Sequence, residues 1–259
     1  KNIPARENSL KNAVQGALLD TKGTYGVVVK NLKTGETYYD NEHKTFDAGS
    51  LYKLWVMAAV FEKIQTGEWD EDQVLSEDVA VLNEIFDVDP EQAELTEGTV
   101  TLSVADALTQ MITISHNYAA LLLVEEIKLS NIAKFLENYG LNESKVGTSG
   151  ETPTITPFDA LLFFEKLYKG ELADQPYTDR MLELLKKQQL NDKLPKYLPQ
   201  GTVVAHKTGE IGWFSHDAGI VYSPKGDYII AILSESDLPA GANERIAQVS
   251  KATFEYFLR

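Results

Sequence analysis

Hydrophobic and polar positions follow two different periods along the chain, and the change from one period to the other occurs twice. Residues 9–20 have the spacing of an amphipathic helix, and residues 24–40 read as two alternating strands joined by a turn. Helical spacing then dominates as far as residue 194. We expect the helices of this region at 50–66, 102–113, 117–128, 130–138, 157–169 and 176–189. After residue 202 the alternation returns in one strand and a hairpin over the turn SPKGD, and an amphipathic helix closes the chain.

This order of elements predicts an α/β fold in which both ends of the chain contribute to one sheet. We expect an antiparallel sheet flanked by the N- and C-terminal helices and interrupted by an inserted all-α region. The α/β domain would comprise residues 1–48 and 196–259, and the all-α domain would comprise residues 49–195. A functional site would then lie between the two domains.

One predicted helix carries a lysine where its surroundings indicate a buried core. In FDAGSLYKLWVMAAVFEKI, residues 46–64, the helical period places Ser50 and Lys53 on one face, and the eight residues after Lys53 are all apolar. These residues alone leave two interpretations open. Ser50 can cap the helix while Lys53 extends its amine to solvent, or the amine can lie inside the protein near the serine hydroxyl.

A second candidate group stands at the break between two helical runs. Ser115-His116-Asn117, in MITISHNYAALLL, is the single instance of Ser-x-Asn in the chain. A loop at that place can present the serine and asparagine side chains into a cleft. The alternative is that Ser115 is a helix N-cap, which is a common role for serine.

The letters Lys-Thr-Gly occur twice, in different settings. The first copy, at 33–35, lies between two alternating strands, where Gly35 supplies the positive φ of a hairpin turn, and we interpret it as structural. The second copy, Lys207-Thr208-Gly209, lies within a predicted strand. Because a glycine inside a strand often marks close approach by another backbone or a ligand, the second copy is the candidate for function.

The three groups, in this order and these settings, resemble the motifs of class A β-lactamases and penicillin-binding proteins, which are Ser-x-x-Lys, Ser-Asp-Asn and Lys-Thr-Gly. The resemblance covers nearly the whole chain. GSLYKL is similar to the start of the family's nucleophile helix, TPTITPFDALLFFEKLYKGEL to the stretch after its Ω loop, and NERIAQVSKATFEYF to its last helix. The resemblance implies a β-lactamase-like fold and a serine hydrolase that forms an acyl-enzyme.

Acyl transfer needs a nucleophile, a base within hydrogen-bond reach and donors for the oxyanion. Ser50 is the candidate nucleophile, and Lys53 is the candidate base because burial in an apolar helix lowers the pKa of an amine. The resemblance implies that Ser115 relays a proton to the leaving nitrogen and that Asn117 holds the substrate's amide side chain. It also implies an oxyanion hole made by the backbone N–H groups of Ser50 and Glu210.

The second Lys-Thr-Gly strand would bind the other end of the substrate. By the same resemblance, Lys207 and Thr208 bind the substrate carboxylate, while the strand edge around Gly209 pairs with an extended acyl-D-Ala-D-Ala-like backbone. The partner implied is therefore a small molecule, either a β-lactam or a peptidoglycan stem peptide.

The chain departs from the family's pattern in three places. His116 stands where the aspartate of Ser-Asp-Asn is usual, and His206 stands where an acid usually precedes Lys-Thr-Gly. Class A enzymes deacylate with a glutamate in an Ω-loop Glu-x-x-Leu-Asn motif, and no such motif lies between Asn117 and Lys207. NESKVGTSGETPTITP resembles a truncated Ω loop, whose one well-placed carboxylate, Glu151, we interpret as a solvated loop acid. We therefore expect weak hydrolytic turnover of β-lactams.

Composition narrows the remaining classes of function. With 24 Lys and Arg against 39 Asp and Glu, the net charge of −15 repels phosphate backbones, so we expect no nucleic-acid partner. There is no cysteine, and the four histidines show no ligand spacing, so we expect neither a metal nor another cofactor. We expect a monomer outside the cytoplasm that is secreted, periplasmic or anchored through an N-terminal segment that has been removed.

Two alternatives to a β-lactamase-like acyl-enzyme stay open. One is a D-Ala-D-Ala peptidase or penicillin-binding protein that acts on peptidoglycan, and the other is a non-catalytic cell-wall-binding relative. The presence of Lys53 together with Ser50 favours an enzyme, since a pure binder has no need of the base. A hydrolase of the nucleophile-elbow type is rejected because the chain contains no Gly-x-Ser-x-Gly.

Overall fold

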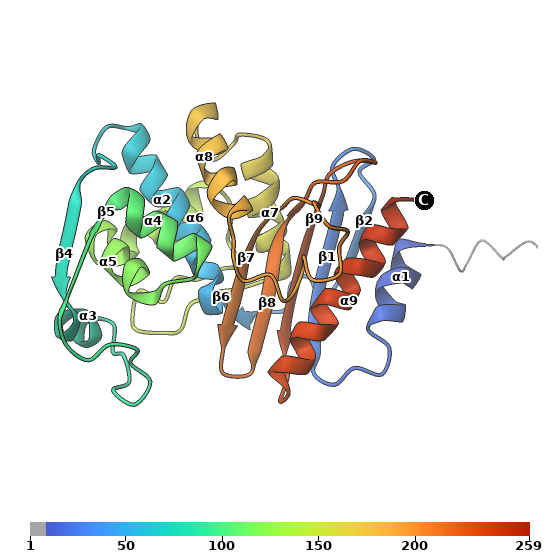
Figure 1. The fold of residues 1–259 in the computed structure, drawn as a ribbon, viewed down its shortest axis with the longest axis horizontal. Helices are drawn as coiled ribbons and strands as arrows, with labels where there is room; N and C mark the ends of the chain where they lie inside the picture. Colours follow the sequence, from blue (N-terminus) through green and yellow to red (C-terminus); the bar gives the residue numbers. More distant parts are fainter. Residues whose placement is uncertain (1–8) are drawn as a thin grey trace, which may run out of the picture.

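The computed structural model describes residues 9–259, which form a central sheet with a helical region at one end (Figure 1). The sheet has the strand order β2-β1-β9-β8-β7, and every neighbouring pair is antiparallel. Its strands are β1 (Thr24–Asn31), β2 (Thr37–Asp40), β7 (Val204–Ile211), β8 (Phe214–Val221) and β9 (Tyr228–Glu235). Because β1 pairs with β9, the two ends of the chain build one sheet. The prediction of an α/β fold with an antiparallel sheet is confirmed.

Helices cover both faces of this sheet. The helices concerned are α1 (Leu10–Ala17), α9 (Pro239–Phe257) and α7 (Pro157–Tyr168). α1 and α9 pack together over one face, and α7 packs against β1, β8 and β9 on the other. The side chains of Val27 and Val29 belong to the core under α1 and α9. The side chain of Val28 belongs to the core on the α7 side. A strand covered on both faces therefore reads as an unbroken apolar run.

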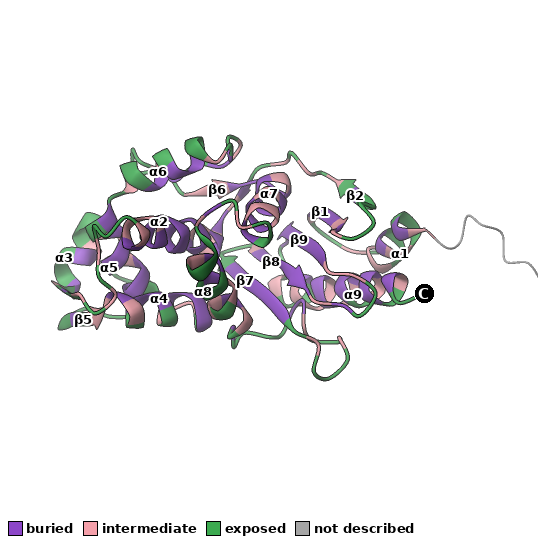
Figure 2. Ribbon diagram, turned by 90° about the horizontal axis from the view of Figure 1, so that it is seen from above, coloured by how far each residue is buried: buried purple, intermediate pink, exposed green. Residues whose placement is uncertain are grey.

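α2 lies at the centre of the helical region and is buried along most of its length (Figure 2). The bounds of the helices in this region are α2 (Lys53–Gln65), α4 (Val104–Thr113), α5 (Asn117–Ile127), α6 (Leu129–Asn138) and α8 (Gln175–Lys186). The other four helices all contact α2. Each residue from 54 to 61 is at most 2% exposed, which explains the run of apolar residues on every side of this helix.

The middle region differs from the prediction because it is not purely helical. The additional elements are β3 (Phe46–Asp47), the 3-10 turn η2 (Gly49–Tyr52), β4 (Val74–Asp78), α3 (Val79–Ile85), β5 (Thr99–Ser103) and β6 (Thr154–Ile155). β4 pairs with β5, and β3 pairs with β6. In β5 the inward positions are Val100 and Leu102, a period-2 pattern too short to stand out from the helix that follows.

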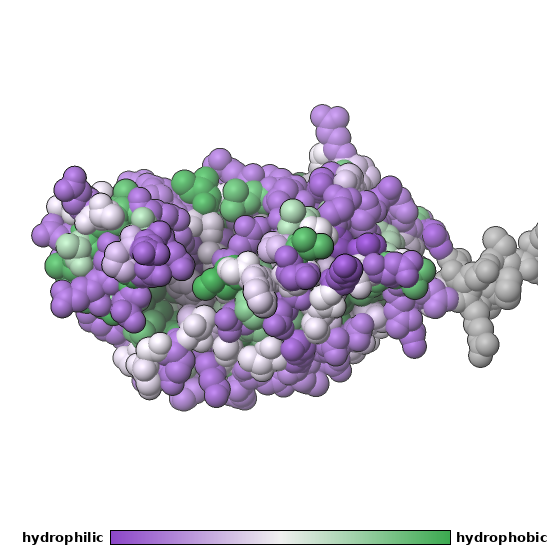
Figure 3. All heavy atoms as spheres, turned by 90° about the horizontal axis from the view of Figure 1, so that it is seen from below, coloured by the Kyte–Doolittle hydropathy of each residue, from purple (hydrophilic) through white to green (hydrophobic). Residues whose placement is uncertain are grey.

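The boundaries of the two domains stay a prediction, and residues 1–8 of the first range lie outside the described residues. Between residues 9 and 259, no helix combines the length and apolar character needed to cross a membrane. Seen from below, the surface is mostly hydrophilic, with small scattered hydrophobic spots (Figure 3).

The first Lys-Thr-Gly copy forms the turn between β1 and β2, as predicted. The Asn31 side-chain oxygen accepts the backbone N–H groups of Lys33 and Thr34, each at 2.9 Å. Gly35 has φ +74°, a conformation that favours glycine. This copy closes a hairpin, so it serves as a control for the copy on β7.

Candidate active site

The η2 turn that carries Ser50 packs directly against strand β7. A Cβ added at Gly209 would lie 2.9 Å from the carbonyl oxygen of Ala48, and one added at Gly49 would lie 2.9 Å from the backbone nitrogen of Glu210. Gly49 also has φ +49°. The two glycines thus allow the backbones of the turn and the strand to approach closely, which places the backbone nitrogen of Glu210 beside the Ser50 turn.

Lys53 is completely buried at the start of α2. Its Nζ donates to the Ser115 carbonyl oxygen at 2.6 Å, to Ser115 Oγ at 3.2 Å and to Asn117 Oδ1 at 2.7 Å. The alternative in which Lys53 extends to solvent is therefore wrong. Burial lowers the pKa of the amine from 10.5 to about 7, and the negative charge of Glu94 opposes this shift.

The loop before α5 presents the second group of side chains. The N-cap of α5 is His116, whose Nδ1 accepts the backbone N–H of Ala119 at 3.1 Å, so the alternative in which Ser115 caps this helix is wrong. Ser115 instead has φ +59°, an uncommon conformation for a residue other than glycine. The histidine at position 116 thus satisfies the helix end, and the side chains of Ser115 and Asn117 bind Lys53 instead.

Lys207 on β7 meets Ser115 from the opposite side. Its Nζ donates to Ser115 Oγ at 3.0 Å and to the Thr208 carbonyl oxygen at 2.8 Å. The lysine is fully buried, and Thr208 is only 2% exposed. Burial lowers the pKa of the Lys207 amine well below 10.5, and the neighbouring charge of Lys53 lowers it further. Two desolvated amines therefore share one serine hydroxyl.

The structure brings most of the predicted side chains into direct contact, but the Ser50 hydroxyl is not joined to them by a hydrogen bond. Within residues 9–259, the Ser50 hydroxyl has no hydrogen-bond partner, and Lys53 makes its bonds to the Ser115 loop. Ser50 lies next to Lys53 because it is one turn earlier in the chain. Its side chain is partly exposed. In free enzymes, a nucleophile and its base are often joined only when substrate arrives.

The chain matches a known family over almost all of its length. The model of the β-lactamase enzyme family matches residues 8–257. The chain belongs to this family. It is 24% identical to β-lactamase VEB-1 of Pseudomonas aeruginosa, over 98% of this chain and 92% of that protein.

Solved structures agree with this assignment. The β-lactamase from Sphaerobacter thermophilus DSM 20745 has a TM-score of 0.83 and 26% identity, and the match covers 97% of each chain. The structure of PBP-A has a TM-score of 0.83 and 24% identity, and the match covers 96% of each chain. The predictions of a β-lactamase-like fold and of a class A β-lactamase-like serine hydrolase that reacts with β-lactams are confirmed.

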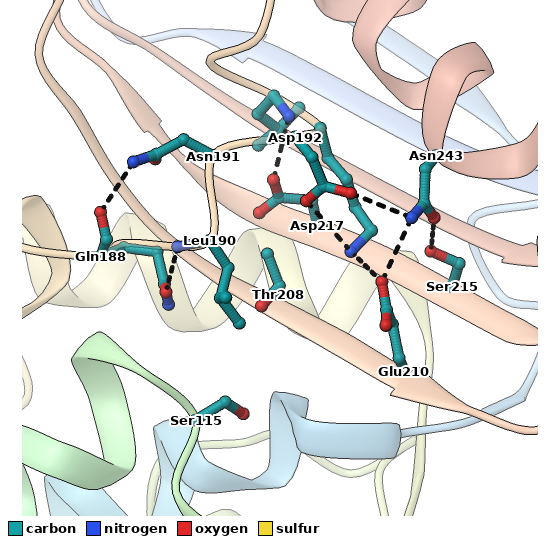
Figure 4. A network of polar contacts seen from close by, with 12 residues as sticks. Ser115, Gln188, Leu190, Asn191, Asp192, Thr208, Glu210, Ser215, Asp217 and Asn243 are labelled. Atoms are coloured by element: carbon teal, nitrogen blue, oxygen red, sulfur yellow. Dashed lines mark hydrogen bonds and ion pairs between the residues drawn. The ribbon is translucent and has the colours of Figure 1, made fainter. Parts of the chain in front are cut away.

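This β-lactamase-family site contains a third buried lysine, which the sequence did not indicate. Lys193 is 1% exposed and forms an ion pair with the carboxylate of Glu210, directly after the Lys-Thr-Gly motif. Asn243 of α9 donates to Glu210 Oε1 at 3.3 Å and to Asp192 Oδ2 at 3.1 Å (Figure 4). Glu210 therefore contributes a side chain that neutralises a buried charge, besides the backbone N–H predicted for the oxyanion.

His206 and Asp217 hold the loop that carries Lys193 against the sheet. His206 Nδ1 lies 2.8 Å from Asp217 Oδ1, and its Nε2 lies 3.1 Å from Asn191 Oδ1. The other oxygen of Asp217 accepts the backbone N–H of Leu194 at 3.0 Å. The acid expected before Lys-Thr-Gly in the family is absent, and His206 at that position pairs with a buried aspartate, Asp217, on the next strand.

Glu151 lies in the segment between α6 and β6, where the sequence resembles an Ω loop. It is exposed, and its carboxylate accepts the backbone N–H of Ser149 at 3.1 Å, which agrees with a solvated loop acid.

Within residues 9–259, no group of three or more His, Asp or Glu side chains is arranged to hold a metal ion.

Proposed function

We propose that this β-lactamase-family protein forms an acyl-enzyme with β-lactams through Ser50, with Lys53 as the general base. The observation that carries the proposal is the complete burial of Lys53, whose pKa falls to about 7. Such an amine is largely neutral just above neutral pH: it then keeps two N–H donors for the Ser115 carbonyl oxygen and Asn117 Oδ1, and its lone pair can accept a proton. Its position one turn after Ser50 and its contact with Ser115 provide the two ends of a proton path.

The proposed reaction moves one proton along this path, from Ser50 to Lys53 and then through Ser115. Ser50 Oγ attacks the lactam carbonyl carbon while its proton moves to Lys53 Nζ, and the backbone N–H groups of Ser50 and Glu210 bind the resulting oxyanion. Collapse of the tetrahedral intermediate breaks the carbon–nitrogen bond. The proton then passes from Lys53 through Ser115 Oγ, 3.2 Å away, to the leaving nitrogen.

Lys207 and Thr208 are proposed to bind the substrate carboxylate. Replacing either residue by alanine removes a charge-assisted hydrogen bond worth about 1.5 to 3 kcal/mol, so acylation at low β-lactam concentration should slow about 10- to 150-fold. Stopped-flow rates with a chromogenic cephalosporin would measure the loss. The matched controls are Lys33→Ala and Thr34→Ala in the hairpin copy, which should acylate at the parent's rate. Equal losses at both copies would contradict the assignment.

We further propose that the segment between α6 and β6 is a truncated Ω loop and that turnover is weak. In support, Glu151 is held within its own loop, and all hydrogen bonds of the Lys53 amine within residues 9–259 go to oxygens of Ser115 and Asn117. No carboxylate among these partners can activate a water molecule on the acyl ester.

A second candidate function is peptidase activity on acyl-D-Ala-D-Ala ends of peptidoglycan. β7 is the edge strand of the sheet and lies against the Ser50 turn, so an extended peptide can pair with it. A mutant of PBP-A was solved as an acyl-enzyme complex with penicillin G. Release of D-alanine from a synthetic acyl-D-Ala-D-Ala peptide would favour the peptidase, and such a substrate would require a location outside the cytoplasm.

A further inference from the structure

An acidic side chain that no motif indicated reaches into the proposed site. Glu94 lies in the loop between α3 and β5, and its Oε1 accepts from Asn117 Nδ2 at 2.7 Å. The other end of the same amide, Asn117 Oδ1, accepts from Lys53 Nζ at 2.7 Å. A lysine, an amide and a carboxylate are thus joined in sequence, with the carboxylate at the outer end.

The contact leaves part of Asn117 available to a substrate. A side-chain amide has two N–H donors, and Glu94 takes one of them. A carbonyl oxygen bound by the second donor would lie about 5 Å from the Glu94 oxygen, since two hydrogen bonds of ordinary length share one nitrogen. Asn117 and Glu94 are both exposed, so a substrate can reach this position.

The charge of Glu94 is not neutralised by its neighbours. No Lys, Arg or His occurs between residues 79 and 103, and Glu94 forms no ion pair within residues 9–259. The same charge acts on Lys53, where it holds the pKa above the value that burial alone would give. A group bound at Asn117 would therefore experience the negative charge of Glu94 at short range.

We propose that Glu94 is a specificity-determining residue, which favours acyl groups carrying an ammonium next to the acyl amide and disfavours those carrying a carboxylate there. This inference rests on the proposed acylation of Ser50. The charged group sits on the carbon next to that carbonyl and so lies within roughly 8 Å of the Glu94 oxygen, a separation at which one unit charge in a solvent-exposed site changes the acylation rate by about two- to fivefold in each direction.

Three penicillins with the same nucleus and a phenylacetyl-type side chain provide a matched probe series. Ampicillin carries an ammonium on the carbon next to the acyl amide, benzylpenicillin carries no charge there, and carbenicillin carries a carboxylate. Second-order acylation rates, measured by intact-protein mass at low salt, should follow that order for the parent. Glu94→Gln should bring the three rates to within about twofold of one another, because the charge is removed and the shape is kept.

The matched control is Glu97→Gln, which removes the same charge from the same exposed loop at a residue without a contact to Asn117. It should keep the parent's order of rates. An unchanged order in Glu94→Gln, or an equal change in both variants, would overturn the inference while the proposed acylation stands. Acylation by none of the three penicillins would overturn the proposed function, and this inference with it.

Discussion

Replacing Lys53 by methionine is expected to slow acylation by β-lactams about 10²- to 10⁴-fold, the usual loss when a general base is removed. Methionine keeps most of the length of the side chain and removes the amine that the fold must desolvate, so thermal unfolding should occur at the parent's temperature or above. Lys53→Ala should show the same loss of labelling, with a lower unfolding temperature because it leaves a cavity. Rapid-quench labelling with a penicillin would measure both variants.

The matched control is Lys63→Met on the same helix, where the amine pairs with Glu68 at the surface. This variant should label at the parent's rate. If Lys53→Met also labels at the parent's rate, or if it unfolds while the residual folded protein reacts normally, Lys53 has only a structural role.

The lowered pKa of Lys53 also sets the pH dependence of this step. A base must be neutral to accept a proton, so acylation should be fastest above the pKa of about 7 and should slow as the amine is protonated below it. At pH 6 the rate should be about one tenth of the plateau. A flat profile between pH 5.5 and pH 8, checked with the same labelling assay, would contradict a role for Lys53 as the base.

The second large effect expected is accumulation of the acyl-enzyme. Acylation needs Ser50, Lys53 and the backbone donors, which lie together, whereas deacylation needs a base aimed at a water molecule. No carboxylate within residues 9–259 contacts Lys53 directly. Deacylation should therefore be about 10² to 10⁴ times slower than in an enzyme with that base. A chromogenic cephalosporin should give a burst of one equivalent followed by a slow phase.

The variant Glu151→Gln tests whether Glu151 accounts for any turnover that is observed. If Glu151 supplies the water-activating base through movement of its loop, the variant should trap an adduct that the parent releases. We expect the same slow phase in both, because the carboxylate is engaged with Ser149 and faces solvent. Sustained hydrolysis at an ordinary β-lactamase rate would contradict the weak-turnover proposal.

The sequence was sufficient to predict the features that depend on local patterns. The apolar residues around Lys53 indicate its burial because a helix surrounded by other helices needs apolar side chains on every face. The residues around each Lys-Thr-Gly copy distinguished a hairpin turn from a strand. Gly35 provides the positive φ of the turn, and Gly209 allows the backbone of the Ser50 turn to approach the strand. The strands at both ends of the chain similarly indicated the shared sheet.

The features that the sequence did not indicate depend on contacts between distant residues. Glu94 meets Asn117, and Lys193 meets Glu210, but lysine and glutamate in polar loops are ordinarily solvated, so their letters carry no signal. The short β4–β5 pair was missed because five alternating residues run directly into a helix. The capping role of His116 was missed because the residue is not among the usual N-caps.

The most direct test of the proposed acyl-enzyme is intact-protein mass measurement after incubation with benzylpenicillin, followed by peptide mapping. We expect a single added penicilloyl group on Ser50 that persists for many minutes, and no addition to Ser50→Ala. An unchanged mass after prolonged exposure, or an adduct that maps to Ser115 or another residue, would contradict the assignment of Ser50 as the nucleophile.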